Sequence, residues 1–294
     1  MIRRGAASFI RALMLVPACL CASATVARAQ GPAAFPVGSA DRMLDESPFL
    51  AQQLQFSRVR KARHTQEAEL QRLFAERGIQ YPSAEIFLRA FKRERVLELW
   101  ARDAATGRFA KLTDYPICAL SGELGPKRKQ GDQQVPEGFY SIEAFNPWSQ
   151  YHLSLGIDYP NRADRMRGTG ARLGGDIFIH GDCKTIGCLP VTDDKIEELY
   201  WIAVQARAAG QRAIPVHIFP GRMDETGMQV LDRYAAGNPA LTAFWGELKK
   251  GYDYFEAARI LPRVRIDEDG HYVVNSYRGV PLNLVNKLTV RTRI

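Results

Sequence analysis

The sequence predicts an α+β fold in which a helical arm precedes a β-rich core. Apolar residues recur at helical spacing between about Pro48 and Arg77, which is typical of one or two amphipathic helices. From Ala84 the chain changes to short alternating or apolar runs bounded by Gly, Pro and Asn, which are typical of strands. These runs follow one another without regularly intervening helices, which argues against alternating βαβ units.

The first 29 residues have the composition of a secretory signal peptide. A basic segment precedes an apolar run from Ala12 to Ala24, and Ala27-Arg28-Ala29 has the form of a cleavage signal. The apolar run is short for a membrane span, so a retained membrane anchor is the less favoured alternative. We therefore expect cleavage near Ala29 and export to the periplasm or cell envelope.

Net charge argues against a nucleic-acid partner. The chain carries 40 Lys and Arg against 32 Asp and Glu, a formal charge of +8. Removal of residues 1–29 takes four arginines and no acidic residue, which leaves +4. That mild excess suits an anionic polymer such as cell wall, and no basic run is interleaved with aromatic residues as in nucleic-acid-binding segments.

The cysteine count indicates one free thiol. Cys19 and Cys21 lie in the predicted signal peptide, so Cys118, Cys183 and Cys188 remain. An odd number of cysteines in an exported protein leaves at least one unpaired. A disulfide between Cys118 and Cys183 would leave Cys188 reduced, but sequence alone does not establish that geometry.

We expect four parts along the chain: a signal peptide (1–29), a linker and helical arm (30–83), a catalytic domain (84–221) and a C-terminal extension packed on it (222–294). Predicted strands in the third part cover about 86–92, 95–103, 108–118, 138–145, 150–158, 176–181 and 213–221. A helix is expected from Thr192 to Gly210, another after Asn238-Pro239, and a hairpin about Asp269-Gly270. A long polar loop, residues 121–138, follows the strand predicted at 108–118, and it is expected to expose its run of basic residues at 127–129.

The most informative stretch runs from Gly175 to Tyr200. An apolar strand delivers His180, and a short polar loop then leads to Cys188, with a helix expected directly afterwards. A cysteine before a helix N-terminus lies in a positive backbone field that lowers the thiol pKa. We therefore predict that Cys188 is a nucleophile and His180 its general base. Gly187 leaves room for substrate, and backbone N–H groups beside it could form an oxyanion hole.

Other readings of this stretch remain open. His180, Asp182, Cys183 and Cys188 have the side chains of a zinc site but lack its usual spacing. Cys183 and Cys188 could form a redox pair, although they are not a C-x-x-C motif. Cys188 could also be a buried structural cysteine. His152 and His217 lie among apolar residues and are expected to be core histidines.

At these residues the sequence resembles the YkuD-type L,D-transpeptidases of bacterial cell walls, and within that family the YafK-like subgroup. The resemblance rests on Ile179-His180-Gly181, on Thr185-x-Gly187-Cys188, and upstream on the runs RVLELW (95–100) and VPEGFY (135–140). Ile186 stands where many members have a second histidine, and only eight residues separate His180 from Cys188. The compact loop fits the YafK-like subgroup.

The resemblance implies a β-rich, sandwich-like catalytic domain and an exported, murein-modifying cysteine acyltransferase. Cys188 would form an acyl-enzyme at the L-centre of diaminopimelate in a peptidoglycan stem peptide and pass it to an amine or to water. Gly181, Thr185 and Tyr140 would contact substrate, and no metal or organic cofactor is implied. The alternatives are an L,D-carboxypeptidase or hydrolase that releases murein-linked lipoprotein, and an inert cell-wall-binding module. The acceptor and the oligomeric state are left open.

Overall fold

The computed structural model describes residues 47–275 of the 294-residue chain. The predicted signal peptide, the first part of the linker and the last nineteen residues lie outside this range. Within residues 47–275, no helix is both long enough and apolar enough to cross a membrane.

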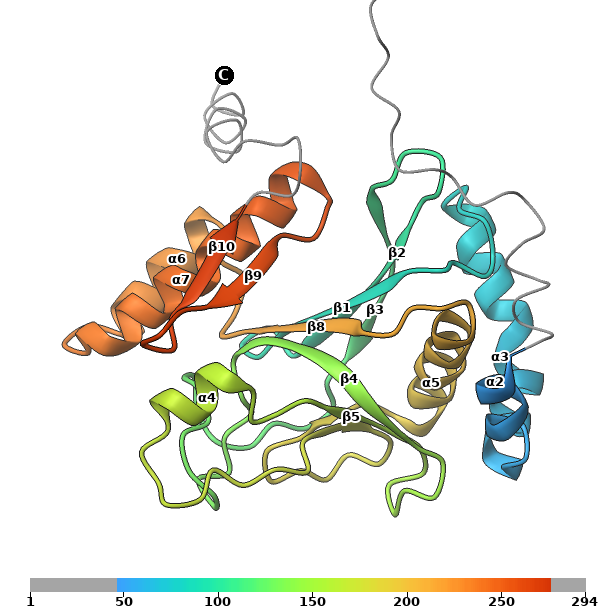
Figure 1. Cartoon of the computed structure of the whole chain (residues 1–294), viewed down its shortest axis with the longest axis horizontal. Coiled ribbons are helices and arrows are strands. Elements are labelled where there is room, and N and C mark those ends of the chain that lie inside the picture. Colours follow the sequence, from blue (N-terminus) through green and yellow to red (C-terminus); the bar gives the residue numbers. More distant parts are fainter. Residues whose placement is uncertain (1–46, 276–294) are drawn as a thin grey trace, which may run out of the picture. The chain divides into compact units, whose positions relative to one another are not determined.

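The core is a mixed sheet of eight strands. In chain order the strands are β1 (Ile86–Phe91), β2 (Val96–Arg102), β3 (Phe109–Pro116), β4 (Gly138–Asn146), β5 (Ser154–Ile157), β6 (Phe178–His180), β7 (Leu189–Pro190) and β8 (Ile214–Phe219). Their order across the sheet is β3-β2-β1-β8-β4-β5-β6-β7. Figure 1 shows β8 between β1 and β4. The predicted β-rich α+β fold is therefore confirmed.

Strand β8 joins the two halves of the sheet. It runs parallel to β1, with Leu88 opposite Val216, and antiparallel to β4, with Tyr140 opposite the same Val216. All six residues of β1 are buried, as expected for a central strand that is covered on both faces. This is why the sequences of β1 and β8 show nearly continuous apolar runs.

The sheet curls until its two ends meet. Just beyond β3, the N–H of Cys118 donates to the carbonyl of Pro190 in β7, at the opposite end of the strand order. A single curled sheet therefore accounts for the sandwich-like layering that was expected. The curl also brings the end of β3 close to the segment that contains Cys188.

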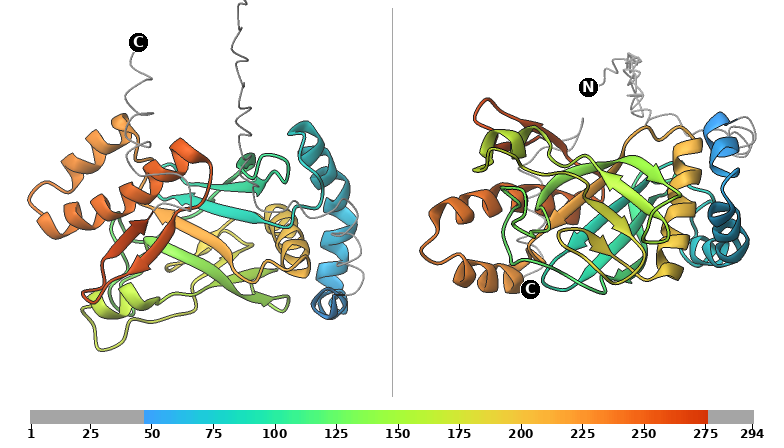
Figure 2. Two further views of the ribbon diagram at one scale, coloured as in Figure 1. Left: turned by 45° about the horizontal axis from the view of Figure 1, so that its top comes forward. Right: turned by 90° about the horizontal axis from the view of Figure 1, so that it is seen from below.

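The helical arm packs on a buried helix. The arm consists of α2 (Pro48–Gln53) and α3 (Ser57–Glu76), and Figures 1 and 2 show both lying against α5 (Asp193–Ala208). Twelve of the sixteen residues of α5 are buried, since the sheet covers one side and the arm another. The predicted arm of one or two helices is thus present as two.

The C-terminal part adds two helices and a hairpin. Helix α6 (Glu225–Tyr234) was not anticipated, whereas α7 (Pro239–Ala258) begins after Asn238 as expected, with the Asn238 side chain accepting the Leu241 N–H. Strands β9 (Arg263–Ile266) and β10 (Tyr272–Asn275) form the predicted hairpin.

One short helix was not anticipated, and two predicted strands are shorter in the structure. The polar segment before β6 contains a short helix, α4 (Arg162–Arg167), which a capping box between Asn161 and Asp164 stabilises. Strands β5 and β6 are shorter than expected, because residues 150–153 form a turn and Asp176 has a left-handed backbone conformation. Helix α5 begins after its N-cap Thr192, as predicted, so it does not follow Cys188 directly. The residue before a proline is pushed toward extended conformations, so Leu189 and Pro190 form β7 first.

Candidate active site

Strands β6 and β7 place the Cys188 and His180 side chains on one face of the sheet. The two strands are parallel, with Ile179 opposite Leu189 and His180 opposite Pro190. Cys188 therefore lies beside Phe178, whose N–H donates to the Cys188 sulfur at 3.4 Å. Because side chains alternate along a strand, Cys188 shares its face with His180, displaced by two residues along the strands.

The Cys188 thiol is held in its protonated form. Its S–H donates to the carbonyl of Asp176 at 3.5 Å, and the side chain is half-buried. Burial raises the pKa of the thiol above its ordinary value, and the Asp176 carboxylate adds to the rise, while the Phe178 N–H and Lys127 oppose it. The predicted lowering of the pKa by a helix N-terminus was wrong, because β7 separates Cys188 from α5.

His180 is buried and oriented as a neutral base. It is 1% exposed, and Nδ1 lies in a short contact with the carbonyl oxygen of Gly181. A carbonyl only accepts, so Nδ1 carries the proton and Nε2 is left with the free lone pair. Burial lowers the pKa of His180 below its ordinary value, although the Gly181 and Asp182 contacts favour the charged form. The imidazole is therefore neutral near neutral pH, with its one proton on Nδ1.

The thiol and the imidazole are close neighbours on the sheet but are not bonded to each other. Among the described residues, Cys188 Sγ makes hydrogen bonds to Phe178 and Asp176 and none to His180. Catalytic hydrogen bonds are often absent from apo structures and form when substrate binds.

These pKa directions predict slow alkylation of Cys188 near neutral pH. A thiol whose pKa is raised is deprotonated only at alkaline pH, so its rate of reaction with iodoacetamide should climb steadily from about pH 7 to beyond about pH 9. The rate is measured by mass spectrometry of the Cys188 peptide, with the unfolded, disulfide-intact chain as the reference. A plateau below about pH 7 would instead mean a preformed thiolate–imidazolium pair, contrary to this prediction.

The backbone N–H groups beside Gly187 are already occupied. Thr185 Oγ1 accepts hydrogen bonds from the N–H of Gly187 at 3.2 Å and of Cys188 at 2.8 Å, and donates to the carbonyl of Cys188. The expected oxyanion hole is therefore filled by the Thr185 hydroxyl, which would have to move aside. Gly187 has φ +132°, a conformation that favours glycine, and a Cβ there would lie 3.1 Å from the Gln134 carbonyl.

The other two residues expected to bind substrate have structural surroundings. A Cβ on Gly181 would crowd the Asp193 carboxylate and lie 3.0 Å from the Tyr151 carbonyl oxygen, so glycine suits the close packing beside His180. Tyr140 is 4% exposed, and its hydroxyl donates to the carbonyl of Glu137 and to the Asp164 carboxylate. Its side chain is therefore almost fully enclosed by the protein, and a substrate contact at Tyr140 stays a prediction.

The cysteine pairing resolves two of the alternatives. Cys118 and Cys183 form a disulfide with a Cα–Cα distance of 5.5 Å, and Cys188 is free. Cys183 is therefore available neither to a zinc site nor to a redox pair with Cys188. The bond fastens the loop between His180 and Cys188 to the end of β3.

Histidines outside the motif divide into two kinds. His217 is buried against Phe87 and Phe139, and burial lowers its pKa to about 3, as befits a neutral core histidine. His152 lies in a turn rather than in the core, and its Nε2 contacts Glu197 at 2.7 Å. The expectation of a core position was confirmed for His217 only.

Sequence reasoning missed three neighbours of the site. Lys127 was expected on the surface but is 4% exposed, pairs with Asp132, and lies close enough to Cys188 to influence the pKa of its thiol. Asp176 supplies the carbonyl that holds the thiol. Tyr151 stacks on His180 with ring centroids 4.6 Å apart. No sequence spacing signals these contacts, although a lysine in a Pro- and Gly-rich loop beside an aspartate was a weak hint.

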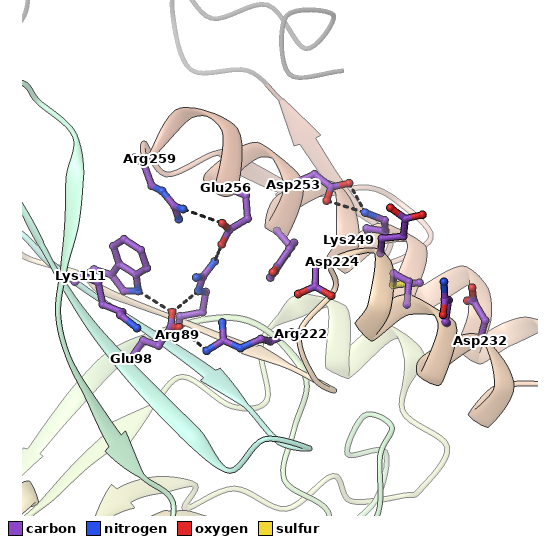
Figure 3. Close-up of a pocket in the computed structure, with 15 residues that line it drawn as sticks. Arg89, Glu98, Lys111, Arg222, Asp224, Asp232, Lys249, Asp253, Glu256 and Arg259 are labelled. Atoms are coloured by element: carbon purple, nitrogen blue, oxygen red, sulfur yellow. Dashed lines mark hydrogen bonds and ion pairs between the residues drawn. The ribbon is translucent and has the colours of Figure 1, made fainter. Parts of the chain in front are cut away.

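A charged cleft lies elsewhere on the molecule. It measures about 800 Å³ and lies between the sheet and helices α6 and α7 (Figure 3). Arg89, Arg222 and Arg259 line it, and each forms an ion pair with Glu98 or Glu256. Neither Cys188 nor His180 lines this cleft. The pair between Arg89 of β1 and Glu256 joins α7 to the sheet.

Comparison with known proteins identifies the family. Residues 85–218 match the YkuD family, described as the L,D-transpeptidase catalytic domain. YafK, a candidate L,D-transpeptidase of Escherichia coli K12, is 37% identical over 198 residues, covering 67% of this chain and 76% of YafK. The same values hold for YafK of E. coli O157:H7.

Solved structures show weaker likenesses. The helical cell shape determining protein Pgp2 of Campylobacter jejuni is 18% identical, with a TM-score of 0.38 over 71% of this chain and 70% of that one. Bd1075 of Bdellovibrio bacteriovorus is 21% identical, with a TM-score of 0.34 over 60% and 62% of the two chains. On the strength of the YkuD match and of YafK, the chain belongs to the YkuD-type L,D-transpeptidase family.

Proposed function

We propose that this protein is an exported murein-modifying enzyme that transfers acyl groups through Cys188, with His180 as general acid and base. The observation that supports it most directly is a free thiol on the same face of the sheet as a buried imidazole whose Nδ1 is bonded to Gly181. A binding module would need neither group. The family match supplies the class of substrate, peptidoglycan stem peptides.

The proposed reaction begins with the neutral pair. His180 Nε2 takes the thiol proton as the Cys188 sulfur attacks the carbonyl carbon at the L-centre of diaminopimelate. The C–N bond then breaks, and the imidazolium returns its proton to the leaving amine, D-alanine or another attached amine. A thioester remains on Cys188.

The second half-reaction repeats these steps with an acceptor. The acceptor, an amine or water, attacks the thioester while His180 takes a proton from it. The Cys188 thiolate then leaves and is reprotonated by the His180 imidazolium. An amine acceptor gives a cross-link, and water gives hydrolysis. If the leaving amine is a lysine of a lipoprotein, hydrolysis releases that lipoprotein from murein, which is the second candidate activity.

Phe178 contributes to this scheme. Its N–H donates to the sulfur and would stabilise the thiolate as it forms and leaves. The oxyanion requires donors as well, and the Gly187 and Cys188 N–H groups can serve once the substrate displaces the Thr185 hydroxyl.

The test uses the full mature chain and defined murein fragments analysed by mass spectrometry. A tetrapeptide-bearing fragment is offered alone, with a second stem peptide as acceptor, and with a lysine-terminated peptide already attached to diaminopimelate. A dimer would identify an amine as the acceptor. Loss of D-alanine without a dimer, or release of the lysine peptide by hydrolysis, would identify water. If no fragment gives a product or an adduct on Cys188, the enzymatic proposal fails.

A further inference from the structure

The turn at residues 149–153 covers one face of the His180 imidazole. Tyr151 stacks on that ring with centroids 4.6 Å apart and planes inclined by 29°. Gly181 supports the edge of the same ring through its carbonyl oxygen. His180 is thus held on an edge by the backbone and on a face by an aromatic side chain, and Tyr151 itself remains 40% exposed.

The helical arm holds this turn. Arg58 of α3 donates through Nη1 to the carbonyl of Ser149 at 2.7 Å and to that of His152 at 2.6 Å. These two carbonyls bracket Tyr151 in the chain. One guanidinium from the arm therefore ties together both ends of the segment that carries the aromatic ring.

A second set of contacts holds the far end of the turn. His152 has a left-handed backbone, with φ +68°, which is uncommon for a residue other than glycine. Its ring contacts Glu197 of α5 at 2.7 Å, and Glu197 also accepts hydrogen bonds from Lys61 and Thr65 of α3. The Glu197 side chain itself is buried, whereas Lys61 is largely exposed.

We propose that Tyr151 is a positioning residue for His180, and that the arm, through Arg58 and the Glu197 contacts, fixes Tyr151 in place. The arm is then part of the active site although it touches no substrate. An aromatic face also attracts the imidazolium that forms when His180 takes a proton. This inference rests on the proposed function of His180 as the base.

The stacking itself is tested without substrate. The His180 ring protons of the wild-type chain should show an upfield ring-current shift in NMR spectra. Tyr151→Phe should keep the shift, and Tyr151→Ala should remove it. Arg58→Ala should reduce it as the turn loosens. Because this readout requires no turnover, it decides the geometric claim even if the chain does not act on murein.

The kinetic test uses the murein fragment that the wild-type enzyme converts. Tyr151→Ala should lower kcat about tenfold with little change in KM, the factor expected for losing an aromatic pair of this kind. Tyr151→Phe should stay within about twofold of wild type, because the stack remains. Arg58→Ala should lower kcat in the same way as Tyr151→Ala. Tyr234→Ala, a half-exposed tyrosine on α6, is the matched control and should leave kcat unchanged.

Several results would overturn the proposal. An unchanged ring-current shift in Tyr151→Ala would mean that the rings do not stack. Equal losses in Tyr151→Phe and Tyr151→Ala would assign the effect to the hydroxyl instead. A normal Arg58→Ala enzyme beside a slow Tyr151→Ala enzyme would remove the arm from the active site and leave Tyr151 acting alone.

Discussion

Replacing Cys188 by alanine is expected to abolish acyl-enzyme formation and murein conversion, by at least about 1,000-fold in kcat/KM. The thiol is the only nucleophile of the proposed covalent route, and its removal leaves no group to form the thioester. Cys118 and Cys183 cannot replace it, since both are tied up in the disulfide. Measurement combines turnover of the murein fragments with mass spectrometry of the trapped adduct.

Two companion variants make this result specific. The kcat/KM of His180→Gln should also fall steeply, because Nε2 is the group that accepts the thiol proton. The Cys188 thiol of this variant should remain available to iodoacetamide. Cys188→Ser keeps the shape of the side chain and tests whether a hydroxyl can substitute for the thiol. Substantial turnover by folded Cys188→Ala protein would contradict the proposed mechanism.

The nearness of His180 and Cys188 in the fold could be predicted because the two lie close together in sequence. His180 and Cys188 are eight residues apart on a strand, a loop and a second strand, so their proximity follows from local structure. The strands of the core were likewise visible as short apolar runs. Such features depend on periodicity and turn residues, which a single sequence records directly.

The contacts that tune these residues could not be predicted in this way. Tyr151 reaches His180 because β5 pairs with β6, and Arg58 reaches that turn across 91 and 94 residues of chain. The raised pKa of Cys188 depends on burial, which only the folded chain determines. The N-terminus of α5 does not lower the pKa of the Cys188 thiol, because Leu189 and Pro190 form β7 between them. The proline that favours this extended segment was visible in the sequence.

The charged cleft is expected to be the place where one substitution costs the most stability. Arg89 of β1 is 3% exposed along its side chain, and bonds Glu98 at 2.8 Å and Glu256 of α7 at 2.6 Å. Its guanidinium also lies over the rings of Phe91, Trp100, Tyr252 and Phe255. Figure 3 shows the chain of ion pairs from Arg222 through Glu98, Arg89 and Glu256 to Arg259.

Arg89→Met should lower the free energy of unfolding by roughly 3–5 kcal/mol, since it leaves the buried Glu98 carboxylate without its main partner. Urea unfolding followed by tryptophan fluorescence measures the loss. Arg72→Met is the matched control: it makes the same change at a guanidinium that bonds Glu69 and Glu76 on the exposed face of α3, and it should leave the unfolding midpoint unchanged.

The double variant Arg89→Met with Glu98→Gln distinguishes a broken ion pair from lost packing. Each single change already destroys the pair, so if the charges dominate, the double variant should lose less stability than the sum of the two singles. Neutral side chains that fill the same volume then avoid the penalty of one unpaired buried charge. Additive losses would instead assign the cost to the aromatic contacts around Arg89. A change of less than about 1 kcal/mol in Arg89→Met would show that these pairs do not hold α7 to the sheet.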